Sequence, residues 1–68
     1  MSLFEKVFKE KGINMTSSRR ALFQVLENSK NHLTVDEILN RARKKDKTLG
    51  LATVYRTLNM LCELGLIE

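Results

Sequence analysis

Side chains that could perform catalysis or bind a metal are scarce in this sequence. Its 68 residues include one histidine, His32, and one cysteine, Cys62. One cysteine cannot form an internal disulfide, and one His with one Cys falls short of the three or more protein ligands of a stable zinc site. Asp36 and Glu37 are adjacent at a predicted helix start, where two carboxylates do not face each other as an acid–base pair. We therefore expect neither an enzyme nor a self-contained metal site.

Basic residues are more abundant, and their distribution is uneven. The chain has 12 Lys and Arg against 8 Asp and Glu, a formal charge of +4. Basic residues gather before a predicted helix over 51–64 and near the start of another over 16–29, whereas residues 57–68 contain none. These residues are Arg41, Arg43, Lys44, Lys45 and Lys47, with Arg19 and Arg20. Such a concentration suits binding to DNA phosphates, although a basic run at a helix end is also typical of a solvated surface.

The beginning of the 51–64 segment carries side chains that could contact DNA bases. Arg56 could reach a phosphate or the acceptor edge of guanine, and Tyr55 could contact a thymine methyl or a phosphate. Thr53 could likewise contact a base or a phosphate. Two helices joined by a short glycine-containing turn form a helix-turn-helix, whose second helix enters the major groove by its N-terminal residues. Tyr55 also fits a boundary position, packed on a neighbouring helix with its hydroxyl in water.

Helices must position these side chains, because apolar residues recur at spacings of three and four along the chain. Thr16 is expected to cap the second helix, and Thr34 and Glu37 have the spacing of a capping box. Gly12, Gly50 and Gly65 suit helix ends and turns. The pattern predicts four helices, at about residues 2–11, 16–29, 34–45 and 51–64.

The length and hydropathy limit the architecture. A chain this short supports one core, and no apolar run approaches the about 20 residues that cross a bilayer. We expect a single, mainly α domain over residues 1–68, located in the cytoplasm and without a membrane partner. In its first helix Leu3, Phe4, Val7 and Phe8 should share one buried face.

The end of the chain yields further expectations. Leu51, Val54, Leu58 and Leu61 form the predicted apolar stripe of the fourth helix. Cys62, beside that stripe, is expected to be a small core residue. Residues 66–68 resemble the first residues of a strand, and Met60 fits either an exposed position or an interface.

Three segments carry a resemblance to a known family. The run from Gly50 to Ile67, GLATVYRTLNMLCELGLI, resembles the recognition-helix segment of the ferric uptake regulator family of metal-dependent bacterial repressors. Residues 16–19, TSSR, are similar to the Thr-x-x-Arg that starts the family's second helix, and residues 32–38, HLTVDEI, to its His-containing segment. The segments occur in the family's order and cover nearly the whole chain.

The resemblance implies a winged helix-turn-helix DNA-binding domain whose β-wing is truncated or absent here, and whose C-terminal dimerisation and metal-binding domain is absent. It implies that Tyr55 and Arg56 face DNA bases or backbone and that Arg19 contacts the backbone. Asn14 stands where several relatives have a lysine that reaches the minor groove; an asparagine could still bind an acceptor there. Ala52 and Thr57 complete the expected DNA-binding set.

The resemblance also implies a role for His32. In the family, the matching histidine contributes to a regulatory metal site whose other ligands lie in the dimerisation domain. We expect no cofactor on this fragment, and Fe(II), Zn(II) or another divalent metal in the full-length protein. The full-length protein is expected to be a homodimer on a palindromic, AT-rich operator, and the fragment a monomer.

The resulting hypothesis is sequence-specific DNA binding by the N-terminal domain of a metal-responsive transcriptional repressor, with a role in iron homeostasis. The alternative is a helical protein–protein interaction module that does not bind DNA. In that case Met60, Leu66 and Ile67 would form the docking surface, and the basic residues would be solvated.

Overall fold

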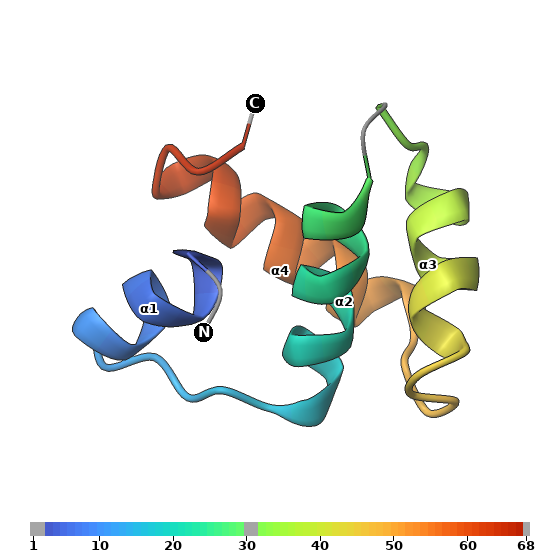
Figure 1. Ribbon diagram of the computed structural model, residues 1–68, viewed down its shortest axis with the longest axis horizontal. Coiled ribbons are helices and arrows are strands. Elements are labelled where there is room, and N and C mark those ends of the chain that lie inside the picture. Colours follow the sequence, from blue (N-terminus) through green and yellow to red (C-terminus); the bar gives the residue numbers. More distant parts are fainter. Residues whose placement is uncertain (1–2, 30–31, 68) are drawn as a thin grey trace.

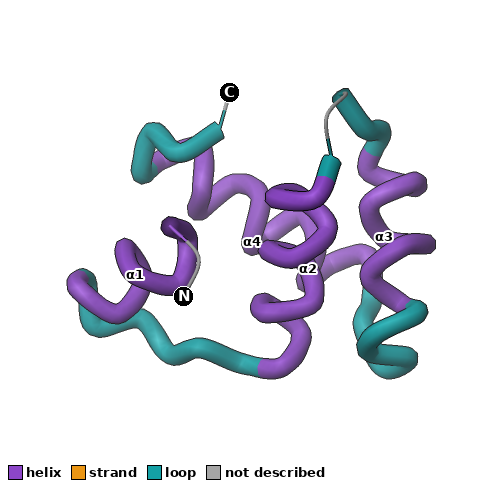
Figure 2. The backbone as a smooth tube through the Cα atoms, in the orientation of Figure 1, coloured by secondary structure: helices purple, strands orange, loops and turns teal. Residues whose placement is uncertain are grey.

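A computed structural model describes residues 3–29 and 32–67 and contains four helices. Their bounds are Leu3–Glu10 (α1), Ser17–Asn28 (α2), Val35–Arg43 (α3) and Leu51–Glu63 (α4). Within the described residues there is no strand (Figures 1 and 2). The expectation of a mainly α, four-helix domain is confirmed, and the predicted helix ends lie within two residues of the observed ones wherever the structure describes them.

Side-chain caps define the starts of α2 and α3. The Thr16 hydroxyl oxygen accepts a hydrogen bond from the Arg19 backbone N–H at 3.2 Å. Thr34 accepts from the Glu37 N–H at 3.1 Å, and the Glu37 carboxylate accepts from the Thr34 N–H at 3.1 Å, which completes a capping box. The bond from the Thr34 backbone lowers the pKa of Glu37 below its ordinary value. Both predicted caps are confirmed.

Two glycines end helices with left-handed backbone. Gly12 has φ 71° and Gly65 has φ 74°, a region that glycine enters without steric cost. After each glycine the next N–H returns to the helix, from Ile13 to the Phe8 carbonyl at 2.8 Å and from Leu66 to the Leu61 carbonyl at 2.9 Å. This is the bonding of a Schellman end.

The strand start predicted at residues 66–68 is not observed where the structure describes it. The Schellman end turns Leu66 back to α4, and Leu66 and Ile67 are half-buried against a cluster of apolar side chains beside α4. Glu68 lies outside the described residues.

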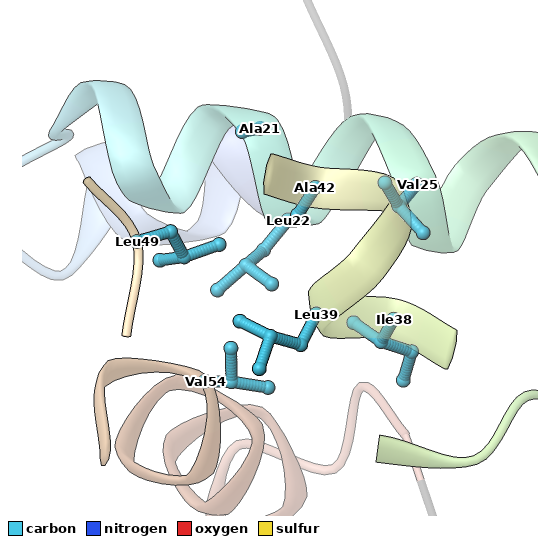
Figure 3. Packing of buried hydrophobic residues seen from close by; sticks show 8 residues of the cluster. All are labelled: Ala21, Leu22, Val25, Ile38, Leu39, Ala42, Leu49 and Val54. Carbon is cyan, nitrogen blue, oxygen red and sulfur yellow. The ribbon is translucent and has the colours of Figure 1, made fainter. Parts of the chain in front are cut away.

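The core has two parts, and α2 contributes to both. α2 packs against each of the other helices, and in Figure 1 it lies between α1 and α3 while α4 crosses them. In the first part, side chains of α2, α3, α4 and the turn before α4 point toward one another (Figure 3). In the second, Phe8 of α1 and Phe23 of α2 pack edge to face, with ring centroids 5.0 Å apart, beside Leu61 of α4.

Three predicted core positions are more exposed than expected. Leu3 is 62% exposed and Leu51 42%, and each is the first residue of its helix. Cys62 is also exposed. Leu61 takes the buried position, and the next residue is rotated by about 100° around the helix. Among the described residues, no helix is long and apolar enough to span a membrane.

The capping box predicts a measurable contribution to stability. Thr34→Ala removes the hydroxyl that accepts from the Glu37 N–H, and we expect the free energy of unfolding to fall by about 1 kcal/mol in urea titrations. Asn40→Ala, on the exposed side of the same helix, serves as the control and should not destabilise the chain. Equal stability of Thr34→Ala and wild type would contradict the assigned cap.

Candidate nucleic-acid interface

α3 and α4 form a helix-turn-helix pair. α3 ends at Arg43, α4 begins at Leu51, and the two helices pack against each other and against α2. The connecting turn is anchored by Leu49, which is 2% exposed and belongs to the first part of the core. The pair is therefore held as a unit rather than joined by a free loop.

Polar contacts also hold the turn. One carboxylate oxygen of Asp46 accepts hydrogen bonds from the Thr48 N–H at 3.0 Å and the Thr48 hydroxyl at 2.6 Å. Its other oxygen accepts from the Ser18 hydroxyl of α2 at 2.7 Å. Arg43 Nε donates to the Leu49 carbonyl at 2.9 Å. The Thr48 hydroxyl, followed by that of Ser18, lowers the pKa of Asp46, which is thus ionised at neutral pH.

These turn contacts were not among the sequence predictions. The Asp-x-Thr spacing of Asp46 and Thr48 is a signal for a side chain that accepts from the backbone two residues on. No sequence signal indicates the bond to Ser18, which lies 28 residues earlier in the chain.

Three residues of the predicted set are exposed near the start of α4, and a fourth is half-buried there. Ala52 and Arg56 are exposed, Tyr55 is 49% exposed, and Thr53 is half-buried. They lie within the first two turns of the helix, so one ligand surface can contact them together.

Thr57 does not belong to this exposed group. Its side chain is 2% exposed and lies on the same face of α4 as the buried Val54 and Leu61. The spacing from Val54 to Thr57 to Leu61 is three and four residues, so all three point into the core. This burial conflicts with the prediction that Thr57 contacts DNA, and we exclude Thr57 from the candidate interface.

The basic residues before α4 lie at the surface. Each of the five predicted members is exposed: Arg41, Arg43, Lys44, Lys45 and Lys47. Arg43 combines exposure with its hydrogen bond to the turn. Exposed positive charge is thus concentrated in the end of α3 and the turn that lead into α4.

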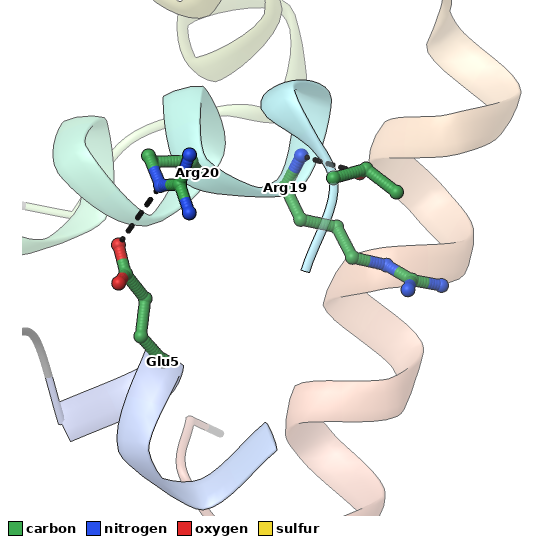
Figure 4. Close-up of polar contacts among 4 residues, drawn as sticks. Glu5, Arg19 and Arg20 are labelled. Atoms are coloured by element: carbon green, nitrogen blue, oxygen red, sulfur yellow. Dashed lines mark hydrogen bonds and ion pairs between the residues drawn. The ribbon is translucent and has the colours of Figure 1, made fainter. Parts of the chain in front are cut away.

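Arg19 and Arg20 have intramolecular partners. The Arg19 guanidinium donates to the Asn14 carbonyl at 2.6 Å and lies 5.7 Å from the centroid of the Phe8 ring. Arg20 pairs with Glu5 of α1 at 3.5 Å. In Figure 4 the two arginines leave α2 in different directions. They help to join α1 to α2, and Asn14, between these helices, is exposed.

His32 and Cys62 line one groove, whose wall also includes the core residue Ile38. The groove has a volume of about 590 Å³ and lies among the end of α2, the start of α3 and α4, with Tyr55 on its wall. His32 is exposed. No group of three or more His, Cys, Asp or Glu side chains that could hold a metal ion occurs in the part of the chain that the structure describes. A metal role for His32 stays a prediction.

Comparison with known proteins identifies the family. The sequence profile described as "Ferric uptake regulator family" matches residues 10–68. The chain belongs to this family. This match confirms the resemblance noted from the sequence. Ferric uptake regulators are metal-responsive transcriptional regulators.

Individual relatives agree with this assignment. The chain is 36% identical over 63 residues to the ferric uptake regulation protein of Rhizobium leguminosarum bv. viciae, covering 93% of the chain and 44% of that protein. It is 35% identical to the ferric uptake regulation protein of Bacillus subtilis (94% of the chain, 44% of the relative). It is also 35% identical to the peroxide operon regulator of that organism (93% and 43%). These names denote regulators rather than enzymes, and the chain spans less than half the length of each.

Proposed function

We propose that this chain is the N-terminal, DNA-binding domain of a metal-responsive transcriptional repressor, with α4 as its recognition helix in the major groove. The observation that carries the proposal is the exposure of Ala52, Tyr55 and Arg56 on the second helix of a helix-turn-helix. Five exposed basic residues precede that helix, and the family consists of regulators.

The α4 side chains differ in what they can recognise. Arg56 donates to guanine acceptors or to a phosphate, and Tyr55 offers its ring to a thymine methyl or its hydroxyl to a phosphate. Ala52 provides a small apolar contact, and Thr53 a hydroxyl within reach of a base edge or phosphate. These residues supply the sequence preference of the complex.

Residues outside α4 supply attraction to the phosphates. Lys44, Lys45 and Lys47 are exposed before α4, where they can neutralise backbone charge and release counterions. Arg19 contacts the DNA backbone, and its hydrogen bond to the Asn14 carbonyl orders its guanidinium. The Asn14 side chain provides a neutral minor-groove contact.

The remaining functions belong to the whole repressor. We propose a cytoplasmic homodimer that binds a palindromic, AT-rich operator and serves iron homeostasis, with the isolated domain a monomer. A bound Fe(II), Zn(II) or similar ion would link metal occupancy to the orientation of the DNA-binding domains. His32 fits such a role because its imidazole is exposed on the groove wall, where ligands from a second domain can complete the set.

No observation favours the alternative of a protein-interaction module. That alternative needs Met60, Leu66 and Ile67 to form an exposed apolar surface. All three are half-buried against the Phe8, Phe23 and Leu61 cluster.

Substitutions in α4 test the proposed interface. The probe is a duplex selected by the wild-type chain from a random-sequence pool, titrated by fluorescence anisotropy. We expect Arg56→Ala and Tyr55→Ala each to weaken binding about five- to tenfold, since each removes a side chain that touches a base or the backbone. Asn59→Ala, exposed on the same helix but one turn farther from its start, is the matched control and should bind like wild type. Unchanged affinity in both test variants would show that α4 is not the reading helix.

The salt dependence tests the role of the basic residues. The double variant Lys44→Ala/Lys45→Ala should reduce the slope of log K against log salt by about 0.9 for each phosphate that is no longer neutralised, because fewer counterions are released. Lys6→Ala removes an exposed charge from α1 instead and should leave the slope at its wild-type value. Equal slopes for all three proteins would show that the phosphates are bound by other residues.

A further inference from the structure

We propose that Asp46 is a positioning residue for DNA recognition: its carboxylate fixes the start of α4 against the first turn of α2 without itself contacting DNA. The inference rests on the proposed function and adds to it a residue that determines specificity indirectly.

The contacts of Asp46 join the turn before α4 to α2. Its oxygens accept from the Thr48 N–H and hydroxyl at 3.0 and 2.6 Å and from the Ser18 hydroxyl at 2.7 Å. Thr48 lies two residues before Gly50, the N-cap of α4, and Ser18 lies in the first turn of α2. One ionised side chain therefore ties the approach to α4 to a helix distant in sequence. Hydrogen bonds to a charged acceptor are stronger than those between neutral groups.

The start of α4 depends on such external contacts. Unlike α2 and α3, α4 has no side-chain cap, because its N-cap residue is Gly50. Its core contacts begin at Val54, the first buried residue of the helix. The preceding residues are positioned by Leu49 in the core, by Arg43 bonded to the Leu49 carbonyl, and by Asp46. Side chains that recognise a ligand must be held to within about 0.5 Å and 10–20°.

The charge of Asp46 makes this role distinguishable from simple electrostatics. Asp46 lies between Lys45 and Lys47, on the segment that the proposed function places near phosphates. A carboxylate there repels DNA, so electrostatics alone predicts that its removal strengthens binding to every duplex. A positioning role predicts that removing the carboxylate weakens binding to the selected duplex. The loss of one negative charge near the phosphates does not restore the geometry of α4.

The experiment measures Asp46→Ala and Asp46→Asn with two probes: the duplex selected by wild type and a scrambled duplex of the same composition. Circular dichroism first establishes the temperature at which all variants are folded. We expect Asp46→Ala to bind the selected duplex about tenfold more weakly and the scrambled duplex as well as or better than wild type. Asp46→Asn should retain most of the discrimination, that is, the ratio of the affinities for the selected and the scrambled duplex. Its amide oxygen can accept from Thr48, and its NH₂ can donate to the Ser18 oxygen. A loss of folded protein alone would lower both affinities equally.

Ser18→Ala and Lys47→Ala provide the matched comparisons. Ser18→Ala should lose part of the discrimination, and combining it with Asp46→Ala should add little further loss, because both remove the same hydrogen bond. Lys47→Ala should weaken both probes alike. Equal discrimination by Asp46→Ala and wild type, or equal behaviour of the Ala and Asn variants, would overturn the positioning role and leave DNA binding intact. Failure of wild type to select or bind any duplex would overturn the proposed function together with this inference.

Discussion

The buried face of α4 determines which of its side chains can meet a partner. Val54, Thr57 and Leu61 point into the core at spacings of three and four residues. Val54 packs with side chains of α2 and α3, and Leu61 packs with the aromatic rings of α1 and α2. With that face occupied, Ala52, Tyr55 and Arg56 must lie at the surface. The candidate interface is thus a consequence of core packing, and any rotation of α4 that exposed Thr57 would remove Val54 and Leu61 from their neighbours.

Core packing alone leaves the first turn of α4 weakly held, and polar contacts complete it. Leu51 is 42% exposed and Gly50 gives no side-chain cap, so the helix start has little burial of its own. The contacts of Asp46 and Arg43 hold the preceding turn, while Thr16 and the capping box stabilise the two helices on which α4 rests. In a domain this small the hydrophobic core supplies only a modest net stability. Local polar contacts of this kind therefore contribute much of what keeps the helix ends in place.

Much of this arrangement follows from local sequence signals. Helical periodicity and the caps at Thr16 and Thr34 are properties of neighbouring residues, and they placed the four helices. The exposure of Cys62 and the burial of Thr57 did not follow, because each depends on the rotation of α4 relative to partners distant in sequence. The same reason explains why the Ser18–Asp46 bond was not predicted. The expectation of a strand after Gly65 was wrong for Leu66 and Ile67, since a Schellman end directs Leu66 back to α4.

Nuclear magnetic resonance would test most directly whether the start of α4 and the turn before it contact DNA. An amide ¹⁵N-labelled chain would be titrated with the duplex that it selects, and the shifted resonances assigned. We expect the largest changes in residues 44–56, which include the basic turn and the exposed start of α4, and small changes at Leu66 and Ile67. Changes concentrated at His32 and Cys62, with residues 44–56 unaffected, would contradict DNA recognition by the start of α4.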